Sequence, residues 1–374
     1  MKLLFNCSTN LQGGAAQNAA NFIISSVKRN TQNSVDIKYH FIISEPVKKI
    51  LDSQKCHVKN YSLIQKSPSK SLVSRSKIKS IERAFCPDLV YTMAGPAYVT
   101  FNSRHIMGCS NPYIIFADYS DINFGRNVFK SIVRYLRTLY QSWYIKKAEY
   151  FIFQTNSSRE SFLEKFNINK NKSFVVNNAM GFLKDEYREE ISQERSSEII
   201  ILCPFEDYPH KGFHIIPKLC ISLNKYIQDF KFLVTIDENK RNKNMLAKYK
   251  SSKFIKLIGK QPYKKMRELY KKSDIVFMPS ILEIFSSVCI ESLYFRVPLV
   301  VSSRDFNRDI LKDHAFYCDP NSIQSCCESI KQAITKKSDH EYLDISKQYI
   351  KRKYGVYSKR HQSIQNILLS LKND

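Results

Sequence analysis

The chain has 374 residues, more than one hydrophobic core usually supports, so we expect two domains. Hydrophobic residues make up 43% and aromatic residues 13% of the sequence, which is enough for packed cores and excludes general disorder. Lys and Arg total 59 against 34 Asp and Glu, and the formal net charge of +25 favours contact with polyanions.

No apolar stretch reaches the roughly 18 residues that a membrane-spanning helix requires. The opening MKLLFNCSTN lacks the long apolar core of a signal peptide, so we expect a cytoplasmic protein. The ten cysteines show no CxxC or mixed Cys/His spacing. We therefore expect reduced thiols, and the sequence predicts no metal site.

Short apolar segments in the first half of the chain predict strands that alternate with helices. The expected strands are residues 3–9, 35–43, 87–95, 111–121, 149–156 and 172–178. Gly13 and Gly14 follow the first strand and permit a tight turn into an Ala-rich helix. This turn lacks the GxGxxG spacing of dinucleotide-binding motifs.

Residues 126–147 form a basic segment with apolar residues at helical spacing. The apolar positions are Phe129, Ile132, Val133, Leu136, Tyr140, Trp143 and Tyr144, with Lys130, Arg134 and Arg137 between them. Such a helix either packs its apolar side into the core or lies on a membrane surface. Both interpretations stay open at the level of sequence.

A polar linker is expected at residues 185–198, after which the alternation of strands and helices begins again. Two halves of this kind predict doubly wound parallel sheets, with the ligand in a cleft between them at the carboxyl ends of the strands. The expected domains are residues 1–184 and 198–345. Residues 346–374 are expected to form a C-terminal helix that packs back on the first domain.

Two carboxylates lie around the start of a helix that is predicted to begin at Ser287, with Glu283 before the start and Glu291 about one turn inside. Eight positions at 100° per residue rotate the chain off one face, so the carboxylates bracket the helix start. Ser286 is a candidate cap, and the free N–H groups of the first turn favour a bound phosphate. Carboxylates beside a diphosphate accept hydrogen bonds from sugar hydroxyls, which predicts a nucleotide-sugar site.

This E-x7-E element and the lysine loop CPFEDYPHKGFHIIPKL at residues 203–219 resemble those of the retaining glycosyltransferases of family 4. The opening NCSTNLQGGAAQ is similar to that of bacterial O-antigen and capsule enzymes. The resemblance covers nearly the whole chain and is strongest over residues 198–320. It implies the GT-B fold of two facing Rossmann-like domains, and metal-independent transfer from a nucleotide-sugar donor to a glycan or lipid-linked acceptor.

The resemblance also implies roles for individual residues. The implied catalytic residues are Lys211, at the donor diphosphate, and Glu283, at the transferred sugar, while Glu291 is expected to hold the ribose hydroxyls. The other implied donor-binding residues are Phe285, Ser286, Ser287 and Val288 at the phosphates, Gly259, Lys260 and Gln261 beside the base, and Gly13 and Gly14 in the first domain. Further candidates for the sugar or acceptor side are His105, Asp118 and His210.

Three positions depart from the family pattern: Glu206 stands where Arg is frequent, and Ile284 and Ser286 stand where glycines are common. Two other functions stay open, namely a nucleotide-sugar epimerase of similar architecture and a non-catalytic protein that binds polyanions or membranes. No specific nucleic-acid partner is expected. The basic surface favours a peripheral position on the inner face of the plasma membrane.

Overall fold

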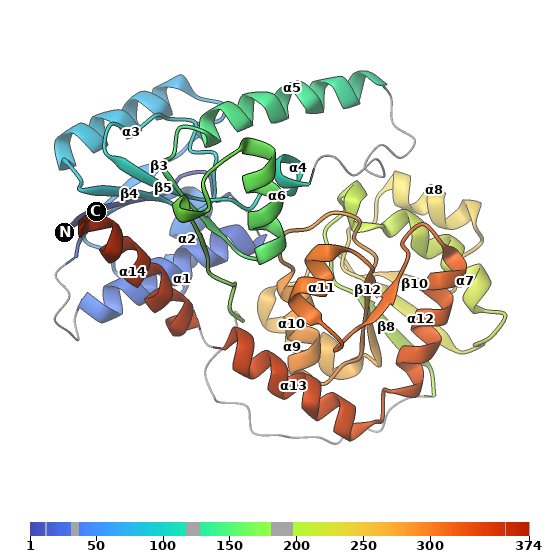
Figure 1. Ribbon diagram of the computed structural model, residues 1–374. Coiled ribbons are helices and arrows are strands. Elements are labelled where there is room, and N and C mark those ends of the chain that lie inside the picture. Colours follow the sequence, from blue (N-terminus) through green and yellow to red (C-terminus); the bar gives the residue numbers. More distant parts are fainter. Residues whose placement is uncertain (12, 31–36, 117–127, 181–196, 356, 374) are drawn as a thin grey trace. The chain divides into compact units, whose positions relative to one another are not determined.

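The computed structural model describes residues 1–11, 13–30, 37–116, 128–180, 197–355 and 357–373. The chain divides into two compact units, of which the first is Met1–Gly181 with Val356–Asp374 and the second is Phe182–Gly355 (Figure 1). The linker predicted at residues 185–198 lies outside the described residues, apart from Ser197 and Glu198. In the described part of the chain, no helix has the length and apolar character needed to cross a membrane.

The first unit is built on a seven-stranded parallel sheet with the order β3-β2-β1-β4-β5-β6-β7. Its strands are β1 (Lys2–Cys7), β2 (Lys38–Ser44), β3 (Tyr61–Ile64), β4 (Leu89–Thr92), β5 (Arg104–Gly108), β6 (Tyr150–Phe153) and β7 (Ser173–Val175). Its helices are α1 (Gly13–Asn30), α2 (Glu45–Ser53), α3 (Leu72–Phe85), α4 (Pro112–Ile115), α5 (Val128–Ile145), α6 (Asn156–Phe166), the 3-10 turn η2 (Lys170–Lys172) and α14 (Tyr357–Asn373).

The strand predicted at residues 111–121 is wrong, because the described part of this segment contains the short helix α4. The Asn111 side chain accepts a hydrogen bond from the Tyr113 amide, and Pro112 occupies the first helical position. An Asn-Pro pair of this kind favours the start of a helix, and here it outweighs the strand pattern of the apolar residues that follow. The strand of this region is β5, which lies earlier in the chain.

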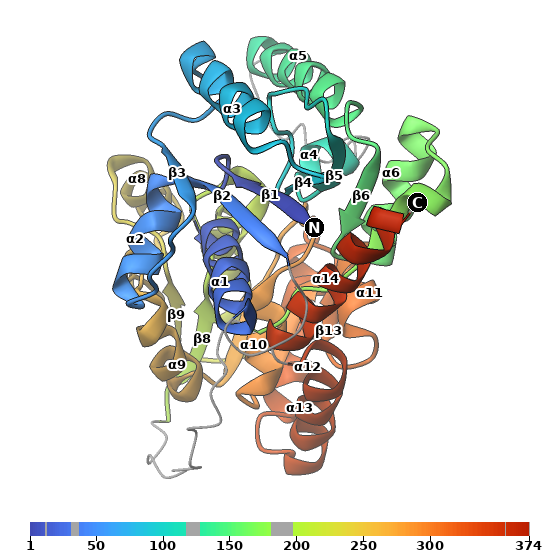
Figure 2. The same ribbon diagram turned by 90° about the vertical axis from the view of Figure 1, so that its left-hand side faces the viewer.

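The helix α14 packs on α1 and completes the core of the first unit (Figure 2). Its buried residues Ile364 and Leu368 belong to the same hydrophobic cluster as Phe5 and Phe22. The His361 ring lies 4.8 Å from the Phe22 ring. The C-terminal segment is therefore two helices, α13 (His340–Tyr354) in the second unit and α14 in the first, which are separated by Gly355 at φ +33°.

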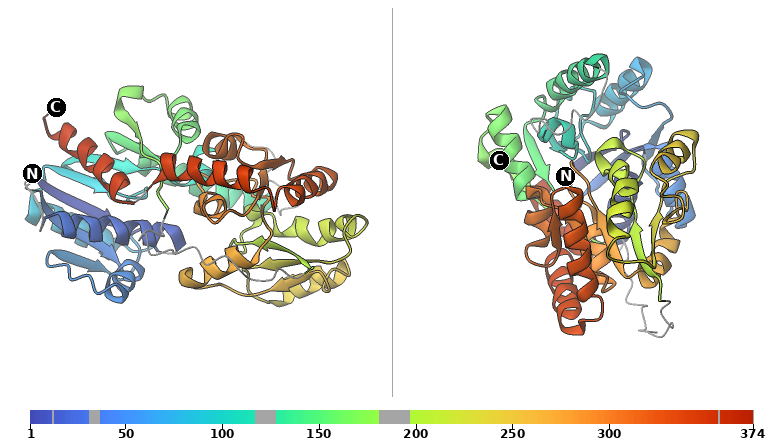
Figure 3. Two further views of the ribbon diagram at one scale, coloured as in Figure 1. Left: turned by 90° about the horizontal axis from the view of Figure 1, so that it is seen from below. Right: turned by 90° about the vertical axis from the view of Figure 1, so that its right-hand side faces the viewer.

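The second unit is built on a six-stranded parallel sheet with the order β10-β9-β8-β11-β12-β13. Figure 3 draws this unit in yellow-green to red. Its strands are β8 (Ile199–Cys203), β9 (Phe230–Val234), β10 (Ile255–Leu257), β11 (Ile275–Met278), β12 (Leu299–Ser302) and β13 (Phe316–Cys318). Its helices are η3 (Pro209–Lys211), η4 (Phe213–Ile215), α7 (Ile216–Leu223), α8 (Lys240–Lys248), α9 (Tyr263–Lys272), α10 (Ser287–Tyr294), α11 (Asp305–Leu311), α12 (Ile323–Thr335) and α13.

Both sheets reverse their strand order beside the first strand. In the second unit the chain proceeds from β8 through β9 to β10, and then returns to the other side of β8 as β11. The first unit does the same at β1 and β4. These reversals confirm the prediction of two doubly wound, Rossmann-like sheets, which bind ligands at the carboxyl ends of the strands beside the reversal.

Candidate functional site

The lysine loop and the E-x7-E element follow the two strands that flank the reversal of the second sheet. The lysine loop leaves β8 after Cys203 and reaches Lys211 at the end of η3. The other loop leaves β11 after Met278 and enters α10 at Ser287. Because β8 and β11 pair in parallel, both loops emerge at the same edge of the sheet. This edge is where a doubly wound sheet binds its ligand.

Backbone contacts hold the two loops together. The Ile281 amide donates a hydrogen bond to the His210 carbonyl oxygen over 2.8 Å. Gly212 has φ +83°, and a Cβ atom added there would lie 2.7 Å from the Pro279 carbonyl oxygen. Only glycine fits this turn, because a side chain would be strained and would also collide with the neighbouring loop. The turn brings the Lys211 side chain against the second loop.

Lys211 and Glu283 form an ion pair between the Nζ and Oε1 atoms. The two side chains are 17% and 13% exposed, so the pair is mostly shielded from water but still reachable by a ligand. An ammonium group in such a place interacts more strongly with a phosphate than a lysine in open solvent does. The structure thus brings together the two residues to which the family resemblance assigns catalytic roles.

The charges of three predicted site residues act on the thiol of Cys289, which lies in the first turn of α10. Burial raises the pKa of its thiol to about 12, and the negative charge of Glu283 acts in the same direction. The charges of Lys211 and Glu291 also act on this thiol. Cys289 therefore stays protonated at neutral pH, which makes it a poor nucleophile.

Glu291 lies inside α10 and is only 3% exposed. The Tyr270 hydroxyl of α9 donates a hydrogen bond to Glu291 Oε2 over 3.0 Å. The Tyr270 ring is fully buried and stacks on the Phe295 ring, with the ring centres 5.3 Å apart. This packing fixes the hydroxyl and thereby orients the carboxylate. Sequence reasoning missed Tyr270, whose position in an amphipathic helix indicates only a core residue.

The helix α10 begins at Ser287, as predicted, but Ser286 does not act as a side-chain cap. Ser286 occupies the N-cap position, and its side chain accepts no hydrogen bond from the helix amides. Its carbonyl oxygen accepts from the Cys289 amide instead, over 3.2 Å. The first turn therefore keeps the positive end of the helix dipole without a capping side chain. Phe285, Ser287 and Val288 are partly exposed at this turn.

The segment Gly259 to Gln261 follows β10, the edge strand of the second sheet. Gly259 has φ +70°, and the Lys260 amide donates to Asp237 Oδ1 over 3.2 Å. The Gln261 side-chain amide donates to the Ile258 carbonyl oxygen and so folds back on its own loop.

Lys260 lies close to Glu206, with 3.8 Å between Nζ and Oε1. Glu206 is the residue that stands where the resemblance implies an arginine. Lys260, in the loop after β10, thus brings a cation to the lysine loop. The ion pair is weak, because the two side chains are 70% and 39% exposed. Sequence reasoning placed Lys260 beside the base and missed this partner.

His210 is half-buried and directly precedes Lys211. Its ring stacks on the ring of Tyr208, with centres 5.5 Å apart and planes inclined by 9°. Tyr208 is 38% exposed, so the lysine loop presents an aromatic surface beside the ion pair. Tyr208 could not be recognised as a site residue from the sequence, because an aromatic residue in a loop is its only signal.

His105 occupies a different environment, in the first unit. It is 3% exposed at the second position of β5, which is the amino end of the strand, and its Nε2 lies 2.9 Å from Thr92 Oγ1. Burial lowers its pKa to about 3, so the ring is neutral. These features argue for a role in packing. Asp118, the other acceptor-side candidate of this unit, lies outside the described residues.

Gly13 and Gly14 open α1 directly after β1, at the reversal of the first sheet. Gly13 has φ +55°. A Cβ atom added to Gly14 would meet no atom within 4 Å, so neighbouring residues do not require a glycine there. The space beside Gly14 is open to an approaching ligand.

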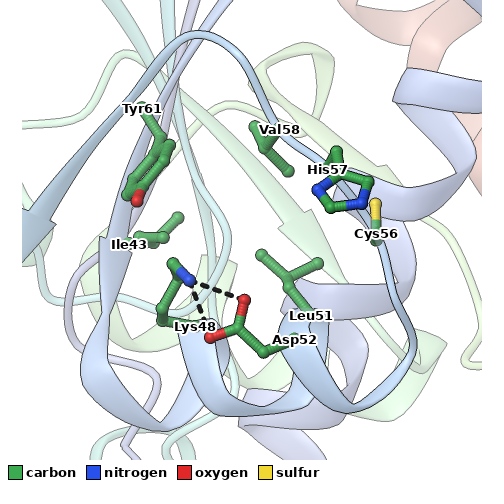
Figure 4. A pocket seen from close by; sticks show the side chains of 8 residues that line it. All are labelled: Ile43, Lys48, Leu51, Asp52, Cys56, His57, Val58 and Tyr61. Atoms are coloured by element: carbon green, nitrogen blue, oxygen red, sulfur yellow. Dashed lines mark hydrogen bonds and ion pairs between the residues drawn. The ribbon is translucent and has the colours of Figure 1, made fainter.

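A small pocket of about 150 Å³ lies elsewhere in the first unit, around α2 and β3 (Figure 4). Its lining residues are Ile43, Lys48, Leu51, Asp52, Cys56, His57, Val58 and Tyr61. Lys48 is held by Asp52 at 2.6 Å, and none of the predicted site residues lines the pocket. In the described parts of both units, no group of three or more His, Cys, Asp or Glu residues is placed to hold a metal ion.

Residues 184–352 match the family described as glycosyl transferases group 1. This part of the chain belongs to that family. The group 1 match includes both loops and the Lys211–Glu283 pair.

Two curated relatives match about half of the chain. A yeast phosphatidylinositol N-acetylglucosaminyltransferase GPI3 subunit (Saccharomyces cerevisiae YJM789) is 22% identical over 48% of this chain and 41% of its own length. The O-antigen chain mannosyltransferase RfbU of Salmonella typhimurium is 20% identical over 50% of this chain and 51% of its own length. The matches thus span about half or less of these relatives.

Several solved structures share the fold of nearly the whole chain. A glycosyltransferase from Rickettsia africae superposes with a TM-score of 0.71 at 17% identity, over 100% of this chain and 99% of that one. Anabaena HepE in complex with UDP-glucose gives 0.71 at 14% identity, over 99% and 100%. A putative UDP-N-acetylglucosamine 2-epimerase from Listeria monocytogenes gives 0.60 at 12% identity, over 92% and 90%. At these identities the likeness shows the fold, GT-B, and no more.

Proposed function

We propose that the protein is a retaining glycosyltransferase that moves a sugar from a nucleotide-diphosphate sugar to a glycan or lipid-linked acceptor. The observation that carries this proposal is the Lys211–Glu283 ion pair, held at the reversal of the second sheet beside the first turn of α10. Family membership of residues 184–352 supports it. The fold shared with a protein in complex with UDP-glucose supports the class of donor.

In this proposal the second unit binds the donor. The Lys211 ammonium and the first-turn amides of α10 contact the diphosphate. Glu291, oriented by Tyr270, accepts hydrogen bonds from the ribose hydroxyls, and Glu283 accepts them from the transferred sugar. The segment Gly259 to Gln261 lies beside the base.

Stabilisation of the departing diphosphate is the main contribution to the rate. Negative charge grows on the diphosphate as its bond to the anomeric carbon breaks. A fixed ammonium and fixed helix-end amides stabilise this charge more in the transition state than in the bound substrate. Lys211 supplies this positive charge without a metal ion.

The acceptor hydroxyl attacks the anomeric carbon from the face that the diphosphate leaves, which retains the configuration. The new C–O bond forms as the bond to phosphate breaks, the hydroxyl proton passes to the departing phosphate, and the nucleoside diphosphate is released. Cys289 is too buried and its thiol pKa too high to act as a covalent nucleophile. This supports a direct route over one through a glycosyl-enzyme.

For the biological setting we propose surface-polysaccharide synthesis, in which the first unit binds an O-antigen or capsule precursor. The O-antigen enzyme RfbU among the relatives supports this setting. His105, Asp118 and the Gly13–Gly14 turn stay candidates for the acceptor side. Of the two that the structure describes, the glycine turn lies at the carboxyl edge of its sheet and His105 at the amino end of its strand.

Thermal-shift measurements against a panel of nucleoside diphosphates and their sugars test the donor site. We expect at least one nucleotide to raise the melting temperature of the protein, because ligand binding to the folded state stabilises it. The Lys211→Ala variant should lose most of this shift. A panel without any shift contradicts the donor site.

Product analysis separates transfer from epimerisation, the reaction for which the Listeria monocytogenes protein of the same fold is named. The stabilising nucleotide-sugar is incubated with the protein alone and with candidate glycan acceptors. We expect nucleoside diphosphate to accumulate in proportion to a glycosylated acceptor. An epimerised donor in the absence of acceptor contradicts the proposal and assigns the site to an isomerase.

Removal of divalent metals provides a further prediction. Since Lys211 supplies the positive charge at the diphosphate, the transfer rate should be the same with and without EDTA. A rate that EDTA abolishes and magnesium or manganese restores would show that a metal ion takes part.

A further inference from the structure

The helix α5 turns its apolar side to solvent. It contributes seven of the fifteen large hydrophobic residues that are exposed in the described part of the chain. Four of them recur at three- or four-residue spacing and therefore share one face of the helix. These four, called the α5 stripe below, are Ile132, Leu136, Leu139 and Trp143, with exposures between 49% and 58%.

The opposite face of α5, which packs on the protein, is largely polar. The Gln141 side-chain amide donates to the Tyr98 hydroxyl over 2.8 Å. The Arg134 guanidinium lies over the Tyr113 ring, 5.6 Å from its centre. Ile145 is the buried apolar residue at the end of this face. An ordinary surface helix turns its apolar face to the core and its polar face to solvent. The α5 stripe faces solvent, so packing in the core of this unit does not explain it.

The start of α3, close to α5, carries two more exposed apolar residues. Arg75 of α3 donates a hydrogen bond to the Tyr144 hydroxyl of α5 over 2.9 Å, which places the first turn of α3 against the last turns of α5. Leu72 and Val73 of this turn are 76% and 80% exposed. The two helices approach one another near their ends in Figure 1 and lie next to each other in Figure 2.

The charge around the stripe is positive. No acidic residue occurs between Val128 and Ile145, while Arg137 is exposed on α5 and Lys146 and Lys147 follow its last turn. The Lys147 ammonium lies over the Trp143 ring, 4.7 Å from its centre. Long basic side chains beside Trp and Tyr match the headgroup region of an anionic membrane.

We propose that the α5 stripe, with Leu72 and Val73, docks on the surface of an anionic lipid bilayer. In this arrangement α5 lies in the plane of the membrane, with its apolar residues between the acyl chains and its cations at the headgroups. A second copy of this chain is a less suitable occupant, because each copy carries a net charge of +25 and the two repel one another.

Trp143 makes the test direct, since it is the sole tryptophan of the chain. Its fluorescence is recorded while the full-length protein is titrated with phosphatidylcholine vesicles, with or without phosphatidylglycerol. We expect a blue shift and protection from acrylamide quenching with the anionic vesicles alone. Unchanged emission, or equal binding to vesicles without anionic lipid, overturns the proposal.

Substitutions locate the surface. Leu136→Glu with Leu139→Glu should weaken co-sedimentation with anionic vesicles by about tenfold or more, because a charge would have to enter the apolar region. Unfolding should be unaffected, since both side chains are exposed. The matched control is Ile345→Glu on α13, where the replaced residue is 53% exposed and vesicle binding should be unchanged.

Two outcomes would exclude the α5 stripe as the membrane-binding surface. In one, the double variant and the control bind vesicles equally well. In the other, sedimentation shows a dimer that the double variant dissociates, while vesicles bind neither form, and the surface is then an interface between two copies. No sugar donor is present in these measurements, so their result does not depend on the proposed transferase activity.

Discussion

At the scale of single residues, Lys211 is the group on which the proposed chemistry depends most. Its substitution by alanine removes the cation from the diphosphate. Loss of one fixed electrostatic contact of this kind lowers kcat by about 10²- to 10³-fold. We expect a decrease of this size in a transfer assay, with an unchanged circular-dichroism spectrum.

The matched control is Lys243→Ala, which removes a lysine with a more exposed ion pair from the same unit. Its effect on kcat should be clearly smaller, because solvent screens an exposed charge. If both variants lose the same activity, Lys211 has no special part in the reaction.

Tyr270 is expected to act on the donor through Glu291. Tyr270→Phe removes the hydroxyl that orients this carboxylate but keeps the buried ring. We expect the KM for the donor to rise several-fold, and the free energy of unfolding to fall by about 1 kcal/mol.

Tyr342→Phe provides the comparison for this prediction, since the Tyr342 hydroxyl donates to the His314 carbonyl oxygen over 3.1 Å in the same unit. It should lower stability to a similar extent and leave KM unchanged. A KM that responds equally to both variants would mean that only general stability is affected.

At the scale of elements, the turn at Gly212 sets the position of Lys211. Gly212→Ala introduces a Cβ atom that collides with the Pro279 carbonyl oxygen at a backbone conformation with positive φ. We expect a loss of about 1 to 3 kcal/mol in the free energy of unfolding, together with a loss of activity. Chemical denaturation and kinetics measure the two effects.

Gly14→Ala is the control for this effect, because its Cβ atom meets nothing in the protein. Alanine in a helix should keep or raise stability. A decrease in activity without a decrease in stability would indicate that a ligand approaches Gly14. An equal loss of stability in both variants would contradict the steric argument at Gly212.

Most strands with buried apolar runs could be predicted from the sequence, whereas the edge strands β3 and β13 could not. The strands β1, β4 and β6 lie in predicted segments because their residues are almost all buried. The edge strand β3 has four residues, mostly only partly buried, and β13 has three, so neither produces a periodic signal. Periodicity predicts α5 as a helix, but it does not reveal that its apolar side faces outward.

The candidate site was only partly predictable for a similar reason. The spacing of Glu283 and Glu291 and the lysine loop identify residues that belong to different segments. Their meeting depends on the hydrogen bond from Ile281 to His210 and on the close approach at Gly212. Backbone contacts between loops leave no pattern in the sequence beyond the glycine itself.

At the scale of the whole molecule, the pH dependence of stability should reflect the buried His105. Its pKa is about 3 in the folded protein against 6.5 for an ordinary histidine, so the unfolded chain binds a proton more readily. The resulting stability is complete above about pH 6.5 and decreases as the pH falls from there towards about 3.

Denaturation at about pH 7.5 and about pH 5 checks this sign. The wild-type protein should lose more free energy of unfolding between the two values than His105→Gln. His40 and His314 remain in both proteins, and burial lowers their pKa as well, so they provide a common background. An identical loss in both proteins would show that His105 does not contribute.

The position of α14 has a consequence for biosynthesis. The core of the first unit joins Leu3 and Phe5 to Ile364 and Leu368, and the whole second unit lies between them in the chain. On the ribosome, residues 182–355 emerge before the helix that covers α1 is made. The core of the first unit is therefore complete only after the second unit has been translated. Until α14 is made, a nascent chain exposes the apolar surface around Phe22.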